Sequence, residues 1–320
     1  MVFLSENQII RSVYNIVSLL SVSVIIPTFN RAQTIKYCID SVLVQTFSHL
    51  EVIVIDDCST DDTVKIVNSY SDLRVRCLVL EKNSGAQAAR NRGIKEAKGD
   101  WIAFQDSDDE WSRDKLEKQV RALSEVNYDP FTVVHTNAIW LDTSTGDQLT
   151  VELPVVEGPD VYPTLLTAPG PLFPTMLVSR LALEKIGYLD ENVPSYQEWD
   201  TSIRLAKYCR FIYLKEPLFI YHLHTGETIS KNKKREIDGY QFIIHKFENE
   251  IKTCCGQEIW EKHLFIQLVK CLNFKLWAES DQYFNSILTK NLKYRVLKIC
   301  RLFHIRPEQL LKTKRYLTGS

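Results

Sequence analysis

Residues 101–111 read WIAFQDSDDEW, in which an apolar run of strand length is followed by three closely spaced aspartates. Asp106, Asp108 and Asp109 place three carboxylates within four residues. Carboxylate oxygens suit hard cations such as Mg²⁺ or Mn²⁺, and an ion held by one or two protein carboxylates completes its shell with water and substrate phosphates. The stretch therefore predicts a metal-diphosphate site after a buried strand. The alternative is that the aspartates only form a turn and cap the following helix, expected from Lys115 to Leu123.

Apolar runs and helical patterns alternate through the first hundred residues. Strands are expected at residues 22–26, 51–55, 75–80 and 101–104, with a helix after each of the first three. The first helix is expected to open at Asn30, with Gln33 as its capping partner. Such alternation is typical of an α/β, doubly wound, mostly parallel sheet, which binds ligands at the carboxyl ends of its strands. The polar residues that follow the four strands should therefore meet at one crevice.

The sequence lacks two well-known phosphate-binding motifs. It has no G-x-G-x-x-G after the first strand and no G-x-x-x-x-G-K-[ST]. An acidic residue after the second strand can instead bind a base or ribose, and the small residues around Gly85 allow close approach of the backbone. Arg90 is a candidate for binding a diphosphate, but pairing with Glu96 or a neighbouring acid is an equally good interpretation.

Four motifs together resemble family 2 glycosyltransferases of the GT-A fold. They are VIIPTFNR at 24–31, IDDCSTDDT at 55–63, N-x-G at 83–85 with ARN-x-G at 89–93, and FQDSDD at 104–109. The resemblance covers residues from about 22 to 230. It implies a nucleotide-sugar donor, usually a UDP-sugar, with Mn²⁺ or Mg²⁺ on its diphosphate.

The resemblance also assigns roles to individual residues. It places Asp57 at the nucleotide base, and it matches Asp106 and Asp108 to the D-x-D element, with one facing ribose and sugar and Asp108 on the metal. Asp109 is expected beside the donor sugar. Cys58 departs from the Gly or Asn usual at its position. The full donor-binding set is Pro27, Thr28, Asn30, Asp57, Asn83, Gly85, Arg90, Asp106, Ser107 and Asp109.

Residues 195–206, SYQEWDTSIRLA, carry the candidate catalytic acids. Ser195 and Glu198 fit a capping box, and Asp200 with Arg204 fits an i,i+4 pair, so each has a structural interpretation. The stretch also resembles the family's E-D-x-D helix, in which an acid deprotonates the acceptor hydroxyl. That resemblance favours Glu198 as the base, with Asp200 as the substitute candidate, although Gln197-Glu198 replaces the usual Glu-Asp. A carboxylate near a helix N-terminus stays ionised and can act as the base.

Two histidines lie close together in the stretch Tyr221-His-Leu-His224. Residues two apart in an extended chain face the same way, so the two imidazoles can share a site. The resemblance places His224 on the metal or diphosphate. A partly buried, hydrogen-bonded histidine at a strand end is the plain alternative.

The chain of 320 residues is predicted to form three parts: an N-terminal amphipathic helix at 1–21, a GT-A catalytic domain at 22–230 and a C-terminal helical region at 231–320. A hairpin is expected at 131–153, and the proline-rich segment after it is expected to shape acceptor access. Eight cysteines without a C-x-x-C pair favour a reduced, cytoplasmic protein. The apolar patch at 13–26 contains polar residues and resembles neither a signal peptide nor a membrane span.

Charge is distributed unevenly although the net charge is −1. Between Lys290 and Arg315, nine basic residues stand against one acid, Glu308. A basic amphipathic helix fits a membrane surface, where the enzyme would be peripheral on the inner face of the cytoplasmic membrane. A helix packed on the protein with its charges in water is the alternative. Nothing else in the chain supports nucleic-acid binding.

These observations predict a metal-dependent, inverting hexosyl- or N-acetylhexosaminyltransferase. It would move sugar from a UDP-sugar to a glycan acceptor, lipid-linked in this interpretation, in bacterial surface polysaccharide synthesis. Two alternatives remain open at this point. A nucleotidyltransferase should show a glycine- and lysine-rich loop near the first strand, which is missing, and a non-catalytic sugar-nucleotide-binding scaffold protein is kept open by the Gln197-Glu198 departure.

Overall fold

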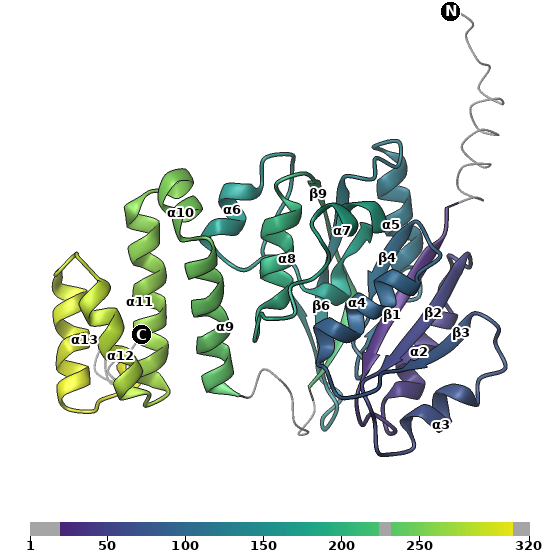
Figure 1. Cartoon of the computed structure of the whole chain (residues 1–320), viewed down its shortest axis with the longest axis horizontal. Helices are drawn as coiled ribbons and strands as arrows, with labels where there is room; N and C mark the ends of the chain where they lie inside the picture. The colour runs from purple at the N-terminus through teal and green to yellow at the C-terminus, as the bar shows by residue number, and fades with distance from the viewer. Residues whose placement is uncertain (1–19, 224–231, 310–320) are drawn as a thin grey trace, which may run out of the picture. The chain divides into compact units, whose positions relative to one another are not determined.

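The computed structural model describes residues 20–223 and 232–309. The expected helix at 1–21 lies almost wholly outside the described residues, and so do His224 and the end of the basic tail. The chain divides into two compact units (Figure 1). The first comprises the chain up to Val161 together with Gly170–Glu191 and Thr201–Thr225, and the second comprises Tyr162–Pro169, Asn192–Asp200 and the chain from Gly226.

One sheet forms the centre of the first unit, with strand order β3-β2-β1-β4-β8-β6-β9-β5 and β7 paired to β6. Every pair of neighbouring strands within β1 to β4 is parallel. Strand β8 runs antiparallel to β4, and β6 and β9 run parallel to each other. The strands are β1 Val22–Thr28, β2 Leu50–Asp56, β3 Val75–Val79, β4 Trp101–Phe104, β5 Glu110–Trp111, β6 Thr132–Asp142, β7 Gln148–Val151, β8 Leu177–Ser179 and β9 Arg210–Leu223.

Helices cover both faces of the parallel half of this sheet. The chain moves outward from β1 to β3 and then returns to β4 on the other side of β1, so right-handed crossovers place α2 and α3 on one face and α4 on the other. Gly93 of α4 packs so closely on Ile25 that an added Cβ would lie 2.5 Å from Ile25 Cγ2. The helices of this unit are α2 Ile35–Leu43, α3 Thr63–Asn68, α4 Ala86–Glu96, α5 Lys115–Ser124, η1 Phe173–Thr175 and α7 Arg180–Lys185.

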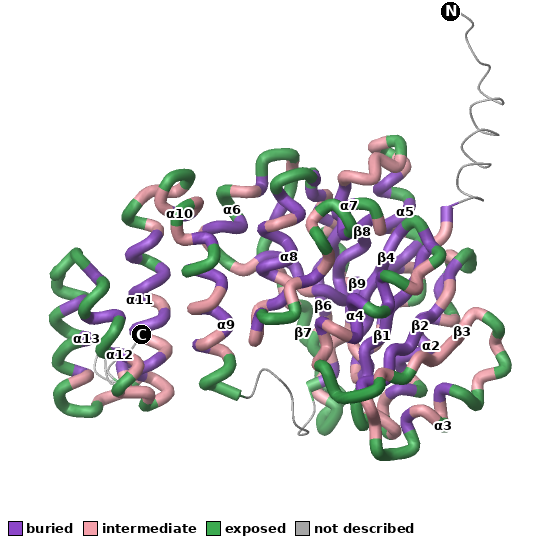
Figure 2. Tube along the Cα trace, in the orientation of Figure 1, coloured by how far each residue is buried: buried purple, intermediate pink, exposed green. Residues whose placement is uncertain are grey.

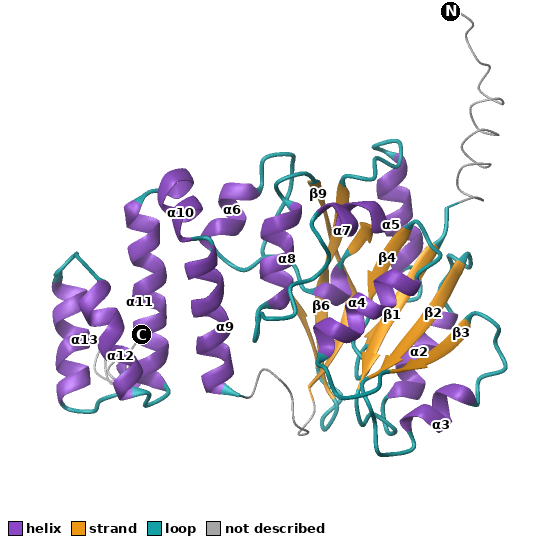
Figure 3. Cartoon of the chain, viewed as in Figure 1, coloured by secondary structure: helices purple, strands orange, loops and turns teal. Residues whose placement is uncertain are grey.

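The regular structure in the described residues of the second unit consists of helices joined by loops (Figure 3). Its centre is an aromatic cluster in which the Tyr240 hydroxyl lies 2.8 Å from His263 Nδ1, and Trp199 Nε1 donates to the Leu165 carbonyl at 2.6 Å. Helix α8 begins in this unit and ends in the first. The elements are α6 Tyr162–Thr167, α8 Gln197–Leu205, α9 Lys233–Lys246, α10 Glu248–Glu250, the π-helical turn η3 Ile251–Cys255, α11 Gln257–Asn273, α12 Trp277–Ser286 and α13 Leu292–Leu302.

The predicted α/β architecture is confirmed, and β4 is buried along its whole length (Figure 2). All eight cysteines are free thiols. In residues 20–223 and 232–309, no helix combines the length and apolar character that a bilayer-spanning segment needs.

The predicted capping pair at Asn30 and Gln33 is wrong. Helix α2 starts later, at Ile35, and Asn30 adopts a left-handed conformation with φ of 51°. Its side-chain oxygen accepts a hydrogen bond from the Thr60 amide at 2.8 Å. Asn30 therefore links the loops that follow β1 and β2. Its side-chain amide can hydrogen-bond to nearby backbone groups, and here it bonds to the loop after β2 instead of capping α2.

Lys115 is fully buried at the start of α5. Its Nζ donates to Gln119 Oε1 at 2.8 Å and lies 3.9 Å from the centre of the Trp111 ring. Burial holds the pKa of the Lys115 ammonium well below its ordinary value.

Replacement of Lys115 by Met should remove a pH dependence of stability. The folded pKa lies below the unfolded value of about 10.4, so between the two the unfolded chain carries a proton that the folded chain lacks. Stability should therefore rise with pH in that window, by up to about 1.4 kcal/mol per unit, in the wild type only. Urea unfolding at neutral and alkaline pH measures the difference between the two proteins. A difference that does not change with pH would mean that Lys115 stays charged in the fold.

Candidate active site

Asp57 organises the loop before α4. Its own amide donates to the Thr28 carbonyl at 2.8 Å, which ties it to the end of β1. One carboxylate oxygen accepts the Ser84 amide at 2.6 Å and the other accepts the Gly85 amide at 2.8 Å. Gly85 has φ of +89°, a conformation that side chains disfavour, while space for a Cβ is open. Asp57 thus shapes the backbone where a nucleotide was expected, and each oxygen keeps a second lone pair for a ligand.

Arg90 is paired with the acidic cluster. Its Nη2 donates to Asp106 Oδ1 at 2.7 Å, and its guanidinium lies 4.9 Å from the centre of the Phe173 ring. The alternative partner, Glu96, is instead bound by Arg92 at 2.9 Å. Arg90 is buried, and its bond to Asp106 holds its charge at the edge of the sheet where Asp106 lies.

Arg31 meets the second acid of the cluster. Its Nη2 lies 3.4 Å from Asp108 Oδ2, and its backbone amide donates to Thr63 Oγ1 at 2.8 Å. No sequence pattern singled out Arg31, although Arg31 directly follows Asn30 in the first motif. Arg31, from the loop before α2, and Arg90, from helix α4, therefore balance two of the three aspartates.

Asp109 is the most enclosed acid of the cluster. Oδ1 accepts the backbone amide of His222 at 2.8 Å, while Oδ2 is buried with no hydrogen-bond partner among the described residues. Burial raises the pKa of Asp109 well above its ordinary value, and the carboxylates of Asp106 and Asp108 add to the effect. The site therefore contains an acceptor that is held in place on one side and unpartnered on the other.

His222 connects β9 to the acidic loop. Its ring stacks on Tyr37 with centroids 5.0 Å apart, and its Nε2 lies 2.8 Å from Glu110 Oε2. The Tyr37 hydroxyl donates to the Asp108 carbonyl at 2.9 Å. His222 was singled out from the sequence only because it lies close to His224. Its backbone bond to Asp109 joins residues 113 positions apart, a contact that no local sequence pattern indicates.

Several buried polar atoms at this edge of the sheet have no hydrogen-bond partner in the part of the chain that the structure describes. A buried polar group without a partner costs about 1–3 kcal/mol, so such groups are rare unless a ligand or water satisfies them. Here they come from the ends of three parallel strands and the start of α4, where a polar ligand was predicted. The atoms are Thr28 Oγ1, Asp56 Oδ2, Gln87 Nε2, Arg90 Nε, Gln105 Oε1 and Asp109 Oδ2.

The acidic cluster fits a hard divalent cation that takes most of its ligands from elsewhere. Among the described residues no three His, Cys, Asp or Glu side chains are arranged to hold a metal by themselves. Asp106 and Asp108 offer only oxygen atoms, the type that Mg²⁺ and Mn²⁺ prefer, and such ions are usually held by one or two carboxylates plus substrate phosphates.

The remaining predicted donor residues occupy the same edge. Pro27 and Ser107 are buried, at the end of β1 and after β4, whereas Asn83 is exposed in the loop before α4. These contacts give Asn83 no structural role, whereas Asp57 holds the same loop through the Ser84 and Gly85 amides.

The two candidate catalytic acids belong to the second unit. Asp200 is buried, and Oδ1 accepts Lys246 Nζ at 2.6 Å, so its charge is already balanced. Glu198 is half-buried in the first turn of α8. The Ser195 hydroxyl donates to the Arg235 carbonyl at 2.9 Å and so ties the turn before α8 to α9. Of the two acids, Glu198 is the less buried and therefore the more accessible to an acceptor hydroxyl.

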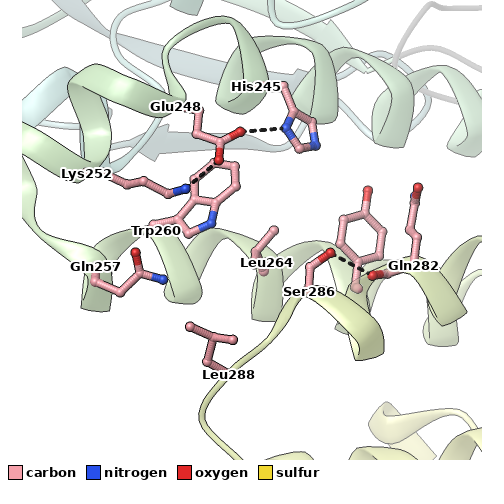
Figure 4. Close-up of a pocket in the computed structure, with 10 residues that line it drawn as sticks. His245, Glu248, Lys252, Gln257, Trp260, Leu264, Gln282, Ser286 and Leu288 are labelled. Atoms are coloured by element: carbon pink, nitrogen blue, oxygen red, sulfur yellow. Dashed lines mark hydrogen bonds and ion pairs between the residues drawn. The ribbon is translucent and has the colours of Figure 1, made fainter.

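The second unit also contains a cavity of about 360 Å³ (Figure 4). His245, Glu248 and Lys252 line it, beside the ring of Trp260. Glu248 accepts from Lys252 at 2.5 Å and lies 3.3 Å from His245 Nδ1. These charged groups satisfy one another, so the cavity lacks the unpartnered polar atoms that mark the edge of the sheet.

Comparison with known proteins gives consistent results. The sequence model of the family described as "Glycosyl transferase family 2" matches residues 23–157. The Escherichia coli protein named UDP-Glc:alpha-D-GlcNAc-diphosphoundecaprenol beta-1,3-glucosyltransferase WfgD is 41% identical over 235 residues, which is 71% of this chain and 86% of that protein. TuaG of Bacillus subtilis, whose name assigns it to teichuronic acid biosynthesis, is 47% identical over 106 residues, only 32% of this chain and 42% of TuaG.

A solved structure has the same fold. The crystal structure of S. aureus TarS 1-349 in complex with UDP-GlcNAc superimposes with a TM-score of 0.57 and covers 94% of this chain and 93% of that one. Identity is 19%, so the likeness concerns the fold alone.

Replacement of Asp57 by Asn should loosen the loop before α4. The new amide group would direct a donor at the Ser84 or Gly85 amide, and one of those hydrogen bonds, which are partly buried, would be lost. The expected loss of stability is about 1–3 kcal/mol, measured by urea unfolding. Asp62→Asn is the control, because its carboxylate is exposed and its change should stay within about 0.5 kcal/mol. Equal stability of the two variants would show that Asp57 does not hold the loop.

Proposed function

The chain belongs to glycosyltransferase family 2, and from that premise we propose that it transfers a hexosyl unit from a UDP-sugar to a hydroxyl group of a glycan acceptor. Its fold is of the predicted GT-A type. The observation that carries the proposal is the group of unpartnered buried polar atoms around Thr28, Arg90 and Asp109. A donor with base, ribose and sugar hydroxyl groups offers the complementary hydrogen bonds.

The donor is assigned to the first unit. Asp57, with Thr28 and Asn30, is proposed to face the nucleotide base, and Arg90 and Arg31 to meet the diphosphate, whose negative charge both guanidinium groups would balance. The name of WfgD mentions UDP-Glc, and TarS was solved in complex with UDP-GlcNAc, so both support a UDP-sugar.

Asp108 would hold a divalent cation and Asp106 would face the ribose and sugar, while His224 stays a proposed metal ligand outside the described residues. When bound, Mn²⁺ or Mg²⁺ would offset the charge that develops on the departing diphosphate.

We propose Glu198 as the general base. The acceptor oxygen bonds to the anomeric carbon while that carbon's bond to the diphosphate oxygen breaks, the hydroxyl proton passes to the Glu198 carboxylate, and UDP leaves. Attack on the face opposite the leaving group inverts the configuration. Glu198 is less buried than Asp200, which supports Glu198 over Asp200 in this role.

The acceptor is proposed to be a glycan on a lipid diphosphate, in bacterial surface polysaccharide synthesis. The name of WfgD specifies such an acceptor, and 86% of that protein aligns with this chain. A lipid-linked acceptor would require the enzyme to work at the surface of the cytoplasmic membrane. Neither a nucleotidyltransferase nor a scaffold protein gains support from these relatives, which are named glycosyltransferases.

Titration of UDP into the full chain tests the donor site. Binding should be strong with Mn²⁺ and at least about tenfold weaker with EDTA, because the cation contributes to binding of the diphosphate. Asp108→Asn should abolish most of the difference between the two conditions, whereas Asp142→Asn in the exposed hairpin should leave it intact. Calorimetry measures both affinities. Equal binding with and without the metal would contradict the assignment of Asp108.

Replacement of Glu198 by Gln tests the base. Transfer should fall by about 10²- to 10⁴-fold, the usual contribution of general base catalysis, while UDP affinity stays unchanged. The matched control is Glu184→Gln, which removes only a surface pair with Arg180. Transfer is followed as UDP release with a lipid-linked acceptor. Normal transfer by the Glu198 variant would reject the assignment and leave Asp200 as the candidate.

A further inference from the structure

Helix α13 has two apolar faces instead of one. Tyr294, Leu297 and Cys300 follow one another at three-residue spacing and are buried. The Tyr294 ring meets Phe284 of α12 edge-on, with centroids 5.4 Å apart. This inner face packs the helix onto its own unit, and it accounts for the structural alternative that the sequence left open.

The opposite face is apolar and open to solvent. Leu292, Val296, Ile299 and Phe303 lie at i, i+4, i+7 and i+11, which is one line along a helix, and Leu302 flanks it. The exposed fractions of these residues are 76% for Leu292, 39% for Val296, 52% for Ile299, 65% for Leu302 and 70% for Phe303. These five side chains form the exposed stripe. The surface of a soluble protein rarely carries so many large apolar side chains in one place unless the patch binds a partner, a ligand or a membrane.

Positive charge borders the exposed stripe. At 100° per residue, Arg295 and Lys298 fall on the side of the line that carries Leu302, and both residues are exposed. Lys293 falls instead toward the inner face, where its Nζ lies 4.9 Å from the centre of the Phe265 ring. Residues 287–307 contain no acid. Arg301 is engaged by Asp281 at 2.9 Å, on the inner side of the helix. The surface is therefore an apolar line with cations along one edge.

We propose that the exposed stripe of α13 is a lipid-binding surface that docks the enzyme onto an anionic membrane. The inference rests on the proposed function, since a lipid-linked acceptor lies at such a surface. Apolar side chains enter the boundary between headgroups and acyl chains, while the flanking Arg295 and Lys298 side chains extend to the anionic headgroups. Cations close to an anionic surface strengthen this attraction.

Charge decides between a membrane and a second copy of the chain. In a symmetric dimer the same surface meets itself, so the cations beside the stripe would face like charges with no acid of 287–307 to balance them. An anionic bilayer is complementary to both the apolar line and its basic border of Arg295 and Lys298. The geometry of α13 thus favours lipid as the occupant.

Co-sedimentation of the full chain with vesicles tests the inference. The wild type should bind vesicles of phosphatidylglycerol and phosphatidylcholine, bind phosphatidylcholine alone weakly, and lose affinity at high salt. The double variant I299S/F303S should bind the anionic vesicles at least about tenfold more weakly, because two apolar side chains no longer enter the lipid. Leu73→Ser is the control, since Leu73 is fully exposed in the first unit, and it should bind as the wild type does.

Two further measurements separate the possible failures. The double variant should keep its UDP affinity and its transfer to a water-soluble acceptor, and lose transfer only to lipid-linked acceptor in vesicles. Wild-type protein that binds UDP but not anionic vesicles would overturn the lipid surface and leave the proposed function standing. A dimer in solution that I299S/F303S abolishes would also overturn it, in favour of self-association. Failure of the wild-type protein to bind UDP would instead reject the proposed function.

Discussion

The pairing of β4 with β1, on the side away from β2, is the constraint on which the site depends. Because the chain passes outward through β2 and β3 before it returns to β4, the loops after β1, β2 and β4 reach the same edge of the sheet. The acidic stretch after β4 consequently lies beside the loops that carry Asn30 and Asp57. Gly93 makes this arrangement possible on the α4 face, since any side chain there would collide with Ile25.

The edge so formed concentrates negative charge in a partly buried place, and the fold compensates it one carboxylate at a time. Arg90 pairs with Asp106, Arg31 lies near Asp108, and the His222 amide bonds to Asp109. The compensation is incomplete, because Asp109 Oδ2 has no partner among the described residues. A site of this kind suits a ligand that brings both cationic and hydrogen-bonding groups, which a metal-bound nucleotide-sugar does.

The second unit divides its polar residues between stability and the proposed functions. Its aromatic centre and the pair of Asp200 with Lys246 are satisfied internally, and so are the charges around the cavity beside Trp260. Glu198, which is half-buried, and the exposed stripe of α13 are the features to which functions are assigned. Catalysis and location are therefore proposed for two different parts of this helical unit.

The sequence by itself determined the alternating strands and helices, the acidic cluster at the end of β4 and the family, because periodicity and short motifs are local properties. It misjudged the cap at Asn30, where a neighbouring loop offered the side chain a better partner than its own helix did. Only the tertiary structure decided that Arg90 pairs with Asp106 and not Glu96, and that His222 holds Asp109. Long side chains have several acids within reach in sequence, and strand order alone selects which of them lies close in space. The same holds for α13, since its composition allowed one apolar face, and the packing of Tyr294 and Leu297 showed that a second one remains exposed.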